Sequence, residues 1–113
     1  MKSYTDIEQS KKLAEILPNE SADNYYSWHD ERYYIVNEDC PYPYSLKEKI
    51  PCWSLAALIS ILPLIDFTTP QLIGTPKTLY RCMYNDDLKS HAYDNPVDAC
   101  CEMILKLKEL KKL

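Results

Sequence analysis

The near absence of glycine restricts the turns and loops that this chain can form more than any other feature of its sequence. Its 113 residues include one glycine, Gly74, and eight prolines. Tight turns with a left-handed backbone usually need glycine, so proline, asparagine and aspartate must mark most turns here. Loops that hold nucleotide phosphates need several glycines close together. The sequence therefore excludes nucleotide-dependent enzymes of the common glycine-loop kinds.

Length and composition predict a single domain over residues 1–113. Hydrophobic residues make up 46% of the chain, which is enough for a core. The formal net charge is −4, whereas proteins that bind nucleic acid or anionic membranes usually carry a basic excess. The longest apolar stretch, residues 50–65, is broken by prolines and is shorter than the ~20 residues of a membrane span. We expect neither a membrane nor a nucleic acid as the main partner.

The cysteines predict reduced thiols in a cytoplasmic protein. Their number is odd and residues 1–6 contain no apolar run, so a disulfide framework is not expected. No C-x-x-C pair is present, and adjacent cysteines on a helix diverge by about 100°. His29 and His91 fall in different predicted hairpins. We therefore expect no metal and no cofactor, and buried apolar roles for Cys40, Cys52, Cys82, Cys100 and Cys101.

Two of the three predicted helices end before a proline. The first covers residues 6–17, with Thr5 and Glu8 at capping-box spacing. The second covers residues 51–62, with Pro51 in its first turn, where a missing N–H is tolerated. It is apolar on nearly every side, which predicts the buried centre of the domain. Both helices end in a similar Leu-x-x-Ile-Leu-Pro pattern, a chance match or a duplicated unit.

The last helix has the clearest signals. Asn95 can cap it, Pro96 takes its first position and Asp98 suits its positive end. We expect it to pack on the tyrosine-bearing sheet. Its apolar stripe consists of Val97, Cys100, Ile104 and Leu107, extended by Cys101, Met103 and Leu110.

Two hairpins are predicted from aromatic and β-branched runs. The first joins residues 24–28 and 32–36, and the second joins residues 78–84 and 88–93 through an Asn-Asp-Asp turn. For residues 66–76 the sequence predicts an edge strand at most. The expected fold class is α+β, an antiparallel sheet from two hairpins packed with three helices, in the order α-β-β-α-(β)-β-β-α.

Four of the ten tyrosines fall on the first hairpin: Tyr25, Tyr26, Tyr33 and Tyr34. Adjacent residues of a strand face opposite sides, so one tyrosine of each pair should face the core and one the solvent. Outward tyrosines beside Trp28 would form a partner-binding surface, since tyrosine gives a large contact area at low entropy cost. The alternative is that tyrosine simply suits half-buried strands.

Other candidate chemistry is weaker. Cys82 and His91 sit on the two arms of the second hairpin, the one pairing that suggests a thiol nucleophile beside a base. The carboxylate pairs Glu38–Asp39 and Asp86–Asp87 fall in predicted turns and are expected to be solvated. A basic helix end that matches the helix dipole, or that contacts nucleic acid, is formed by Lys106, Lys108, Lys111 and Lys112.

Residues 5–18, 50–58 and 94–107 together resemble a group of small uncharacterised proteins of gut bacteria and their prophages. The likeness spans most of the chain and implies a mobile-element setting and a compact intracellular domain. It implies no activity, cofactor or site. A hairpin followed by an Asn-Pro-capped helix is also similar to the antitoxin of HicA–HicB systems in its order of elements.

The leading hypothesis is a non-enzymatic interaction module that binds a protein partner or itself through the tyrosine-rich hairpin. A nucleic-acid-binding accessory protein and a small Cys/His enzyme are the alternatives.

Overall fold

A computed structural model describes residues 2–29, 32–36, 49–65, 68–74 and 79–113. Its helices and antiparallel strands confirm the α+β class. In chain order the elements are α1 (Ile7–Ala14), the short 3₁₀ helix η1 (Asn19–Ser21), β1 (Asn24–His29), β2 (Arg32–Val36), β3 (Ile50–Cys52), α2 (Leu55–Ile61), β4 (Gln71–Gly74), β5 (Tyr80–Met83) and α3 (Pro96–Glu109).

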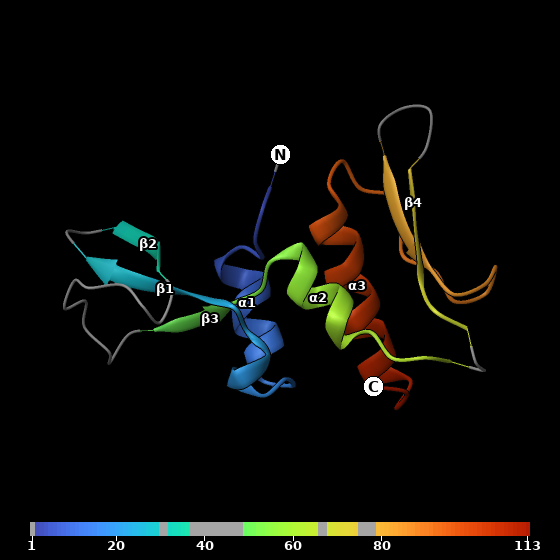
Figure 1. The fold of residues 1–113 in the computed structure, drawn as a ribbon, viewed down its shortest axis with the longest axis horizontal. Coiled ribbons are helices and arrows are strands. Elements are labelled where there is room, and N and C mark those ends of the chain that lie inside the picture. Colours follow the sequence, from blue (N-terminus) through green and yellow to red (C-terminus); the bar gives the residue numbers. More distant parts are fainter. Residues whose placement is uncertain (1, 30–31, 37–48, 66–67, 75–78) are drawn as a thin grey trace.

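The strands form two separate sheets with the helices between them (Figure 1). One sheet has the order β2-β1-β3, and the other pairs β4 with β5, both antiparallel. The first predicted hairpin is confirmed as β1–β2. The expectation that both hairpins share one sheet is replaced by two small sheets at opposite ends of the molecule, and this arrangement leaves the helical centre to supply the core.

The second predicted hairpin is only partly regular. Its turn forms as expected, because the Asn85 side chain accepts hydrogen bonds from the backbone N–H groups of Asp87 and Leu88. Beyond the turn the chain makes isolated bridges to β5 and no continuous strand. One reason is that the Ser90 hydroxyl accepts the N–H of Cys82, replacing a backbone carbonyl in the ladder. β5 instead takes β4, the predicted edge strand, as its partner.

The first helix is shorter than predicted and begins one residue later. Asp6 is its N-cap, and Asp6 and Gln9 form the capping box that the sequence suggested for Thr5 and Glu8. The Thr5 hydroxyl is already engaged elsewhere, since it accepts the N–H of Trp53. The regular helix ends at Ala14, and one further turn follows before Pro18.

The second helix also begins later than predicted. Ser54 is its N-cap, and its hydroxyl accepts the N–H of Ala57 at 3.2 Å. Pro51 lies in β3, paired with Tyr25, and not in the first helical turn. β3 is an edge strand, where a proline without an N–H is tolerated. The helix is not the fully enclosed centre that the sequence predicted. Ala57 and Leu58 are buried, but Ile59 is 47% exposed.

The third helix matches its prediction closely. The Asn95 side chain accepts the N–H of Asp98, and Pro96 is the first helical residue. The predicted stripe is buried except for Leu110, which is 51% exposed because it lies past the last turn that the core covers. α3 packs on a sheet, as expected, and on α2. The sheet is the β4–β5 pair, however, and not the one that contains the tyrosine-rich β1–β2 hairpin. Trp53 and Leu58 lie fully buried in the same core.

Within the described ranges, no helix has the length and apolar character that a bilayer crossing requires.

Candidate functional site

The β1–β2 hairpin places aromatic side chains on both of its faces. Directly opposite residues of an antiparallel pair share a face, and Tyr26 lies opposite Ile35 while Ser27 lies opposite Tyr34. The Tyr33 ring meets the Tyr26 ring edge-on, with centroids 6.4 Å apart. Tyr26, Tyr33 and Ile35 therefore form one surface, called the hairpin face below.

Strand β2 is exposed on both faces, which differs from the sequence expectation. Tyr33 and Tyr34 are each 40% exposed and Ile35 is 43% exposed, while Tyr25 and Tyr26 are both half-buried. Alternation along a strand assigns neighbours to opposite faces but does not ensure that either face is covered. Here the buried core is formed by the helices, Trp53, β5 and the turn after it, so the hairpin extends away from it (Figure 1). The side chain of Trp28 lies outside the described residues.

A cavity of about 410 Å³ lies between the hairpin face and the extended segment before α1. The tyrosine hydroxyl of Tyr26 donates to the backbone carbonyl of Thr5 at 2.6 Å and fixes the hairpin against that segment. Burial raises the pKa of Tyr26, so its hydroxyl stays protonated and remains a donor. The cavity is lined by Lys2, Ser3, Tyr4, Asp6, Tyr26 and Ile35.

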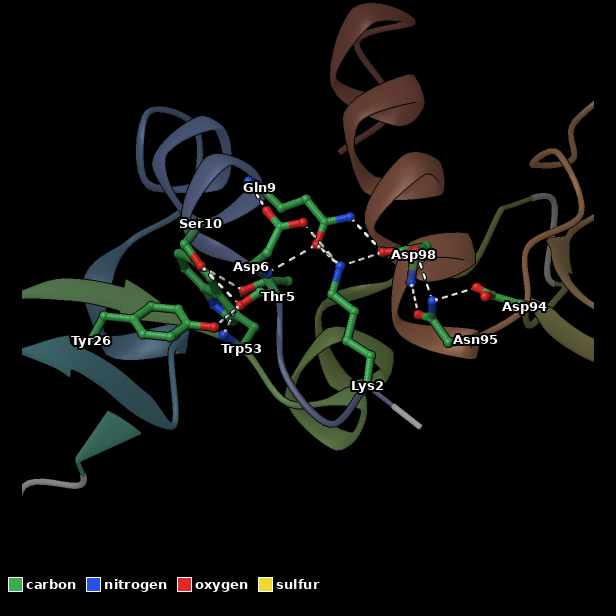
Figure 2. Close-up of polar contacts among 10 residues, drawn as sticks. All are labelled: Lys2, Thr5, Asp6, Gln9, Ser10, Tyr26, Trp53, Asp94, Asn95 and Asp98. Carbon is green, nitrogen blue, oxygen red and sulfur yellow. Dashed lines mark hydrogen bonds and ion pairs between the residues drawn. The ribbon is translucent and has the colours of Figure 1, made fainter. Parts of the chain in front are cut away.

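Lys2 clamps the extended segment to two helix N-termini. Its ammonium donates to Asp98 at 2.7 Å, to the side-chain oxygen of Gln9 at 2.8 Å and to Asp6 at 3.1 Å (Figure 2). Burial alone would lower the pKa of Lys2, but the bonds to Asp98 and Asp6 outweigh it and the pKa lies above its ordinary value. Both carboxylates also suit the positive helix ends beside them. The contact ties the wall of the cavity to α1 and α3.

Thr5 is a buried polar junction that the sequence analysis did not identify. Its backbone N–H donates to the carbonyl of Trp53 at 3.0 Å, and its hydroxyl bonds the hydroxyl of Ser10 at 2.8 Å (Figure 2). With the bonds from Tyr26 and from the Trp53 N–H, it joins the first segment, α1, the hairpin and the start of α2. A threonine before an aspartate looks like a helix cap, and only the pairing with Trp53 reveals the other role.

The proposed pairing of Cys82 with His91 is wrong. Ser90 lies opposite Cys82, because the Ser90 N–H donates to the Cys82 carbonyl at 2.8 Å. His91 is exposed and its ring bonds the Glu102 carboxylate, while its backbone N–H donates to the same group. Cys82 is buried and lies against Cys100 of α3. The Cys82 thiol therefore lies in the core, while the His91 imidazole lies at the surface and bonds a carboxylate.

The described cysteines behave as buried apolar residues. Cys52, Cys82, Cys100 and Cys101 are free and buried, and burial raises the pKa of Cys52 and of Cys101 to about 12. In the part of the chain that the structure describes, no group of three or more His, Cys, Asp or Glu side chains could hold a metal ion. Cys40 and the pair Glu38–Asp39 lie outside that part.

The basic and acidic surface residues occupy different places. Asp86 and Asp87 are exposed in the turn after β5, as expected. Lys108, Lys111 and Lys112 are exposed at the end of α3, whereas Lys106 bends toward the segment after that turn and donates to the carbonyl of Lys89 at 2.7 Å. The four lysines therefore do not form one continuous contact surface.

Comparison with protein-family models, with curated proteins and with solved structures gave no match to this chain.

Proposed function

We propose that this protein is a non-enzymatic interaction module that binds a partner protein through the hairpin face and the adjoining cavity. The observation that carries the proposal is the exposure of Tyr33 and Ile35, the two residues that β2 contributes to the hairpin face. Exposed aromatic clusters on a small protein are frequently binding surfaces, because burying their large apolar area against a partner is favourable in free energy.

The cavity beside the hairpin face suggests how a partner would be held. An apolar side chain of the partner would enter between Tyr26, Ile35 and Tyr4, where aromatic and aliphatic surface is available. Polar backbone groups of the partner would remain near Lys2 and Ser3 at the rim. The chemistry fits an extended peptide segment with one large apolar anchor residue.

The clamp at Lys2 supports the same proposal. A preformed wall reduces the ordering cost of binding, and here one wall is tied to α1 and α3 by ionic hydrogen bonds while the other is fixed by Tyr26. We further propose a cytoplasmic setting, supported by four buried free thiols, and a role in a prophage or similar mobile element, supported by the sequence resemblance described above.

The test is selection of binders from a random peptide library displayed on phage, followed by NMR mapping. We expect the selected peptides to share a large apolar residue and to shift the amide signals of residues 3–5 and 33–35. The Ile35→Ser variant should lose at least about tenfold in affinity, because it removes apolar area from the cavity wall.

A matched control is Leu110→Ser, which removes a similarly exposed apolar side chain from the far end of α3. It should leave affinity unchanged. Peptides that map to the end of α3, or that bind Ile35→Ser as tightly as the wild type, would contradict the proposal.

A further inference from the structure

We propose a second binding site, distinct from the hairpin face, in which the polar cavity between β5 and α3 holds a small phosphate-bearing anion. The cavity has a volume of about 250 Å³. The elements that contribute to its lining, β5 and α3, lie apart from the β1–β2 hairpin (Figure 1). The residues around it are Arg81, Asp87, Lys89, Ser90, His91 and Lys106.

The charge of this lining is opposite to that of the whole chain. Three side chains carry a fixed positive charge and one carries a carboxylate, in a protein with a formal net charge of −4. Glu102 is the acidic side chain next to His91, and its carboxylate is already occupied by the ring and the backbone N–H of that histidine. The cavity is therefore a local positive region that an anion would neutralise.

Arg81 lines the cavity from strand β5. Its guanidinium places a positive charge there, and an anion oxygen in the cavity would accept a hydrogen bond from it. Arginine also presents paired donors that match the oxygens of a phosphate group.

A hydrogen bond also positions Lys106 at the cavity, where its ammonium would contact a bound anion. Its ammonium donates one hydrogen bond to the Lys89 carbonyl at 2.7 Å, which fixes the side chain at the cavity and leaves its other donors available. The hydroxyl of Ser90 lies in the same lining, and it already donates to the carbonyl of His91 at 2.8 Å and accepts from Cys82. The guanidinium and the two ammonium groups therefore carry the recognition.

The ligand class follows from charge and size. A phosphomonoester carries a charge between about −1.5 and −2 near neutral pH, which suits three cations and one carboxylate better than a single carboxylate would. The volume has room for the phosphate and a small attached group. A long nucleic acid is disfavoured because the surrounding protein is acidic.

The test is an NMR titration of the full chain with inorganic phosphate and with phenyl phosphate, at constant ionic strength. Saturable shifts should appear at the amides of Arg81, Ser90 and His91. Arg81→Gln and Lys106→Gln should each weaken binding at least about tenfold, since each removes a charged hydrogen bond. Lys111→Gln removes one charge beyond the end of the same helix and should leave binding unchanged.

Because Arg81 is partly buried, its variant must first match the wild type by circular dichroism. Lys89→Gln provides a second variant that removes another positive charge from the lining. Shifts that do not saturate, or that persist unchanged in the Lys106→Gln and Lys89→Gln variants, would overturn the proposal. A DNA or RNA oligomer that binds more tightly than phenyl phosphate and depends on the same residues would reassign the site to nucleic acid.

Discussion

At the scale of single residues, the polar contacts around Lys2 and Thr5 connect parts of the chain that the sequence keeps apart. Lys2 and Asp98 are 96 positions apart and meet in an ion pair that is mostly shielded from water. Asp98 also accepts from Gln9 and from the Asn95 side chain. Such partially buried, several-fold hydrogen-bonded carboxylates contribute more than exposed ion pairs do.

Acid should weaken the fold through Asp98. Burial alone would raise its pKa, but the bonds from Lys2, Gln9 and Asn95 outweigh it, and the folded-state pKa lies below the ordinary value of 3.8. The native state therefore favours the charged carboxylate, and this stability is present above pH 3.8 and lost as pH falls through the folded-state pKa. We expect Asp98→Asn to lower the melting temperature at pH 7 and to flatten its further fall in acid.

Thermal melts by circular dichroism between neutral pH and about pH 2.5 measure this effect. Asp94→Asn removes an exposed carboxylate from the same end of α3 and should keep the wild-type profile. Parallel acid profiles for the wild type and Asp98→Asn would show that the pair with Lys2 does not stabilise the fold.

Residue roles that depend on distant partners could not be predicted from the sequence. Thr5 looked like a helix cap because a cap needs only local residues, and its actual partner, Trp53, is 48 positions away. The basic cavity likewise brings Arg81 and Lys106 together from two different elements. The exposure of both Tyr33 and Tyr34 was not predictable either, since the period of a strand does not state what covers it.

At the scale of elements, local signals predicted α3 well and α2 less well. Asn95, Pro96 and the apolar stripe of α3 all point to one helix and agree with its packing. Pro51 fits both a first helical turn and an edge strand, and pairing with Tyr25 selects the strand. An N-cap serine three residues later then sets where α2 begins.

The packing of α3 can be tested with one buried and one exposed residue of the same stripe. Ile104 is fully buried, so Ile104→Ala should cost about 2–5 kcal/mol of unfolding free energy. Leu110 is half-exposed, so Leu110→Ala should cost less than about 0.5 kcal/mol. Urea unfolding followed by fluorescence gives both values. Similar costs at the two positions would mean that the helix is rotated relative to the described structure.

At the scale of the whole molecule, the two sheets share the helical centre but no common layer. Among the described elements, β2 packs extensively on β1 alone, while α3 contacts β5, α2 and α1. The core cluster includes Cys82 of β5 and none of the hairpin side chains that the structure describes. Stability should therefore be distributed unevenly along the chain.

Amide hydrogen exchange should show this division. We expect the amides of Tyr34 and Ile35 to exchange through local opening, faster than that of Ile104, which opens only on global unfolding. In the Ile104→Ala variant the α3 amides should accelerate strongly while the hairpin amides keep their rates. Equal acceleration in both regions, measured by NMR under native conditions, would mean that hairpin and helices unfold as one unit.

Because the two sheets lie at opposite ends of the molecule, the two proposed binding sites are separate from each other. A peptide on the hairpin and a phosphate compound beside α3 would touch no common side chain. Neither would displace the other, so both could be carried at once, and a chain of 113 residues would serve as a bridge in a ternary complex.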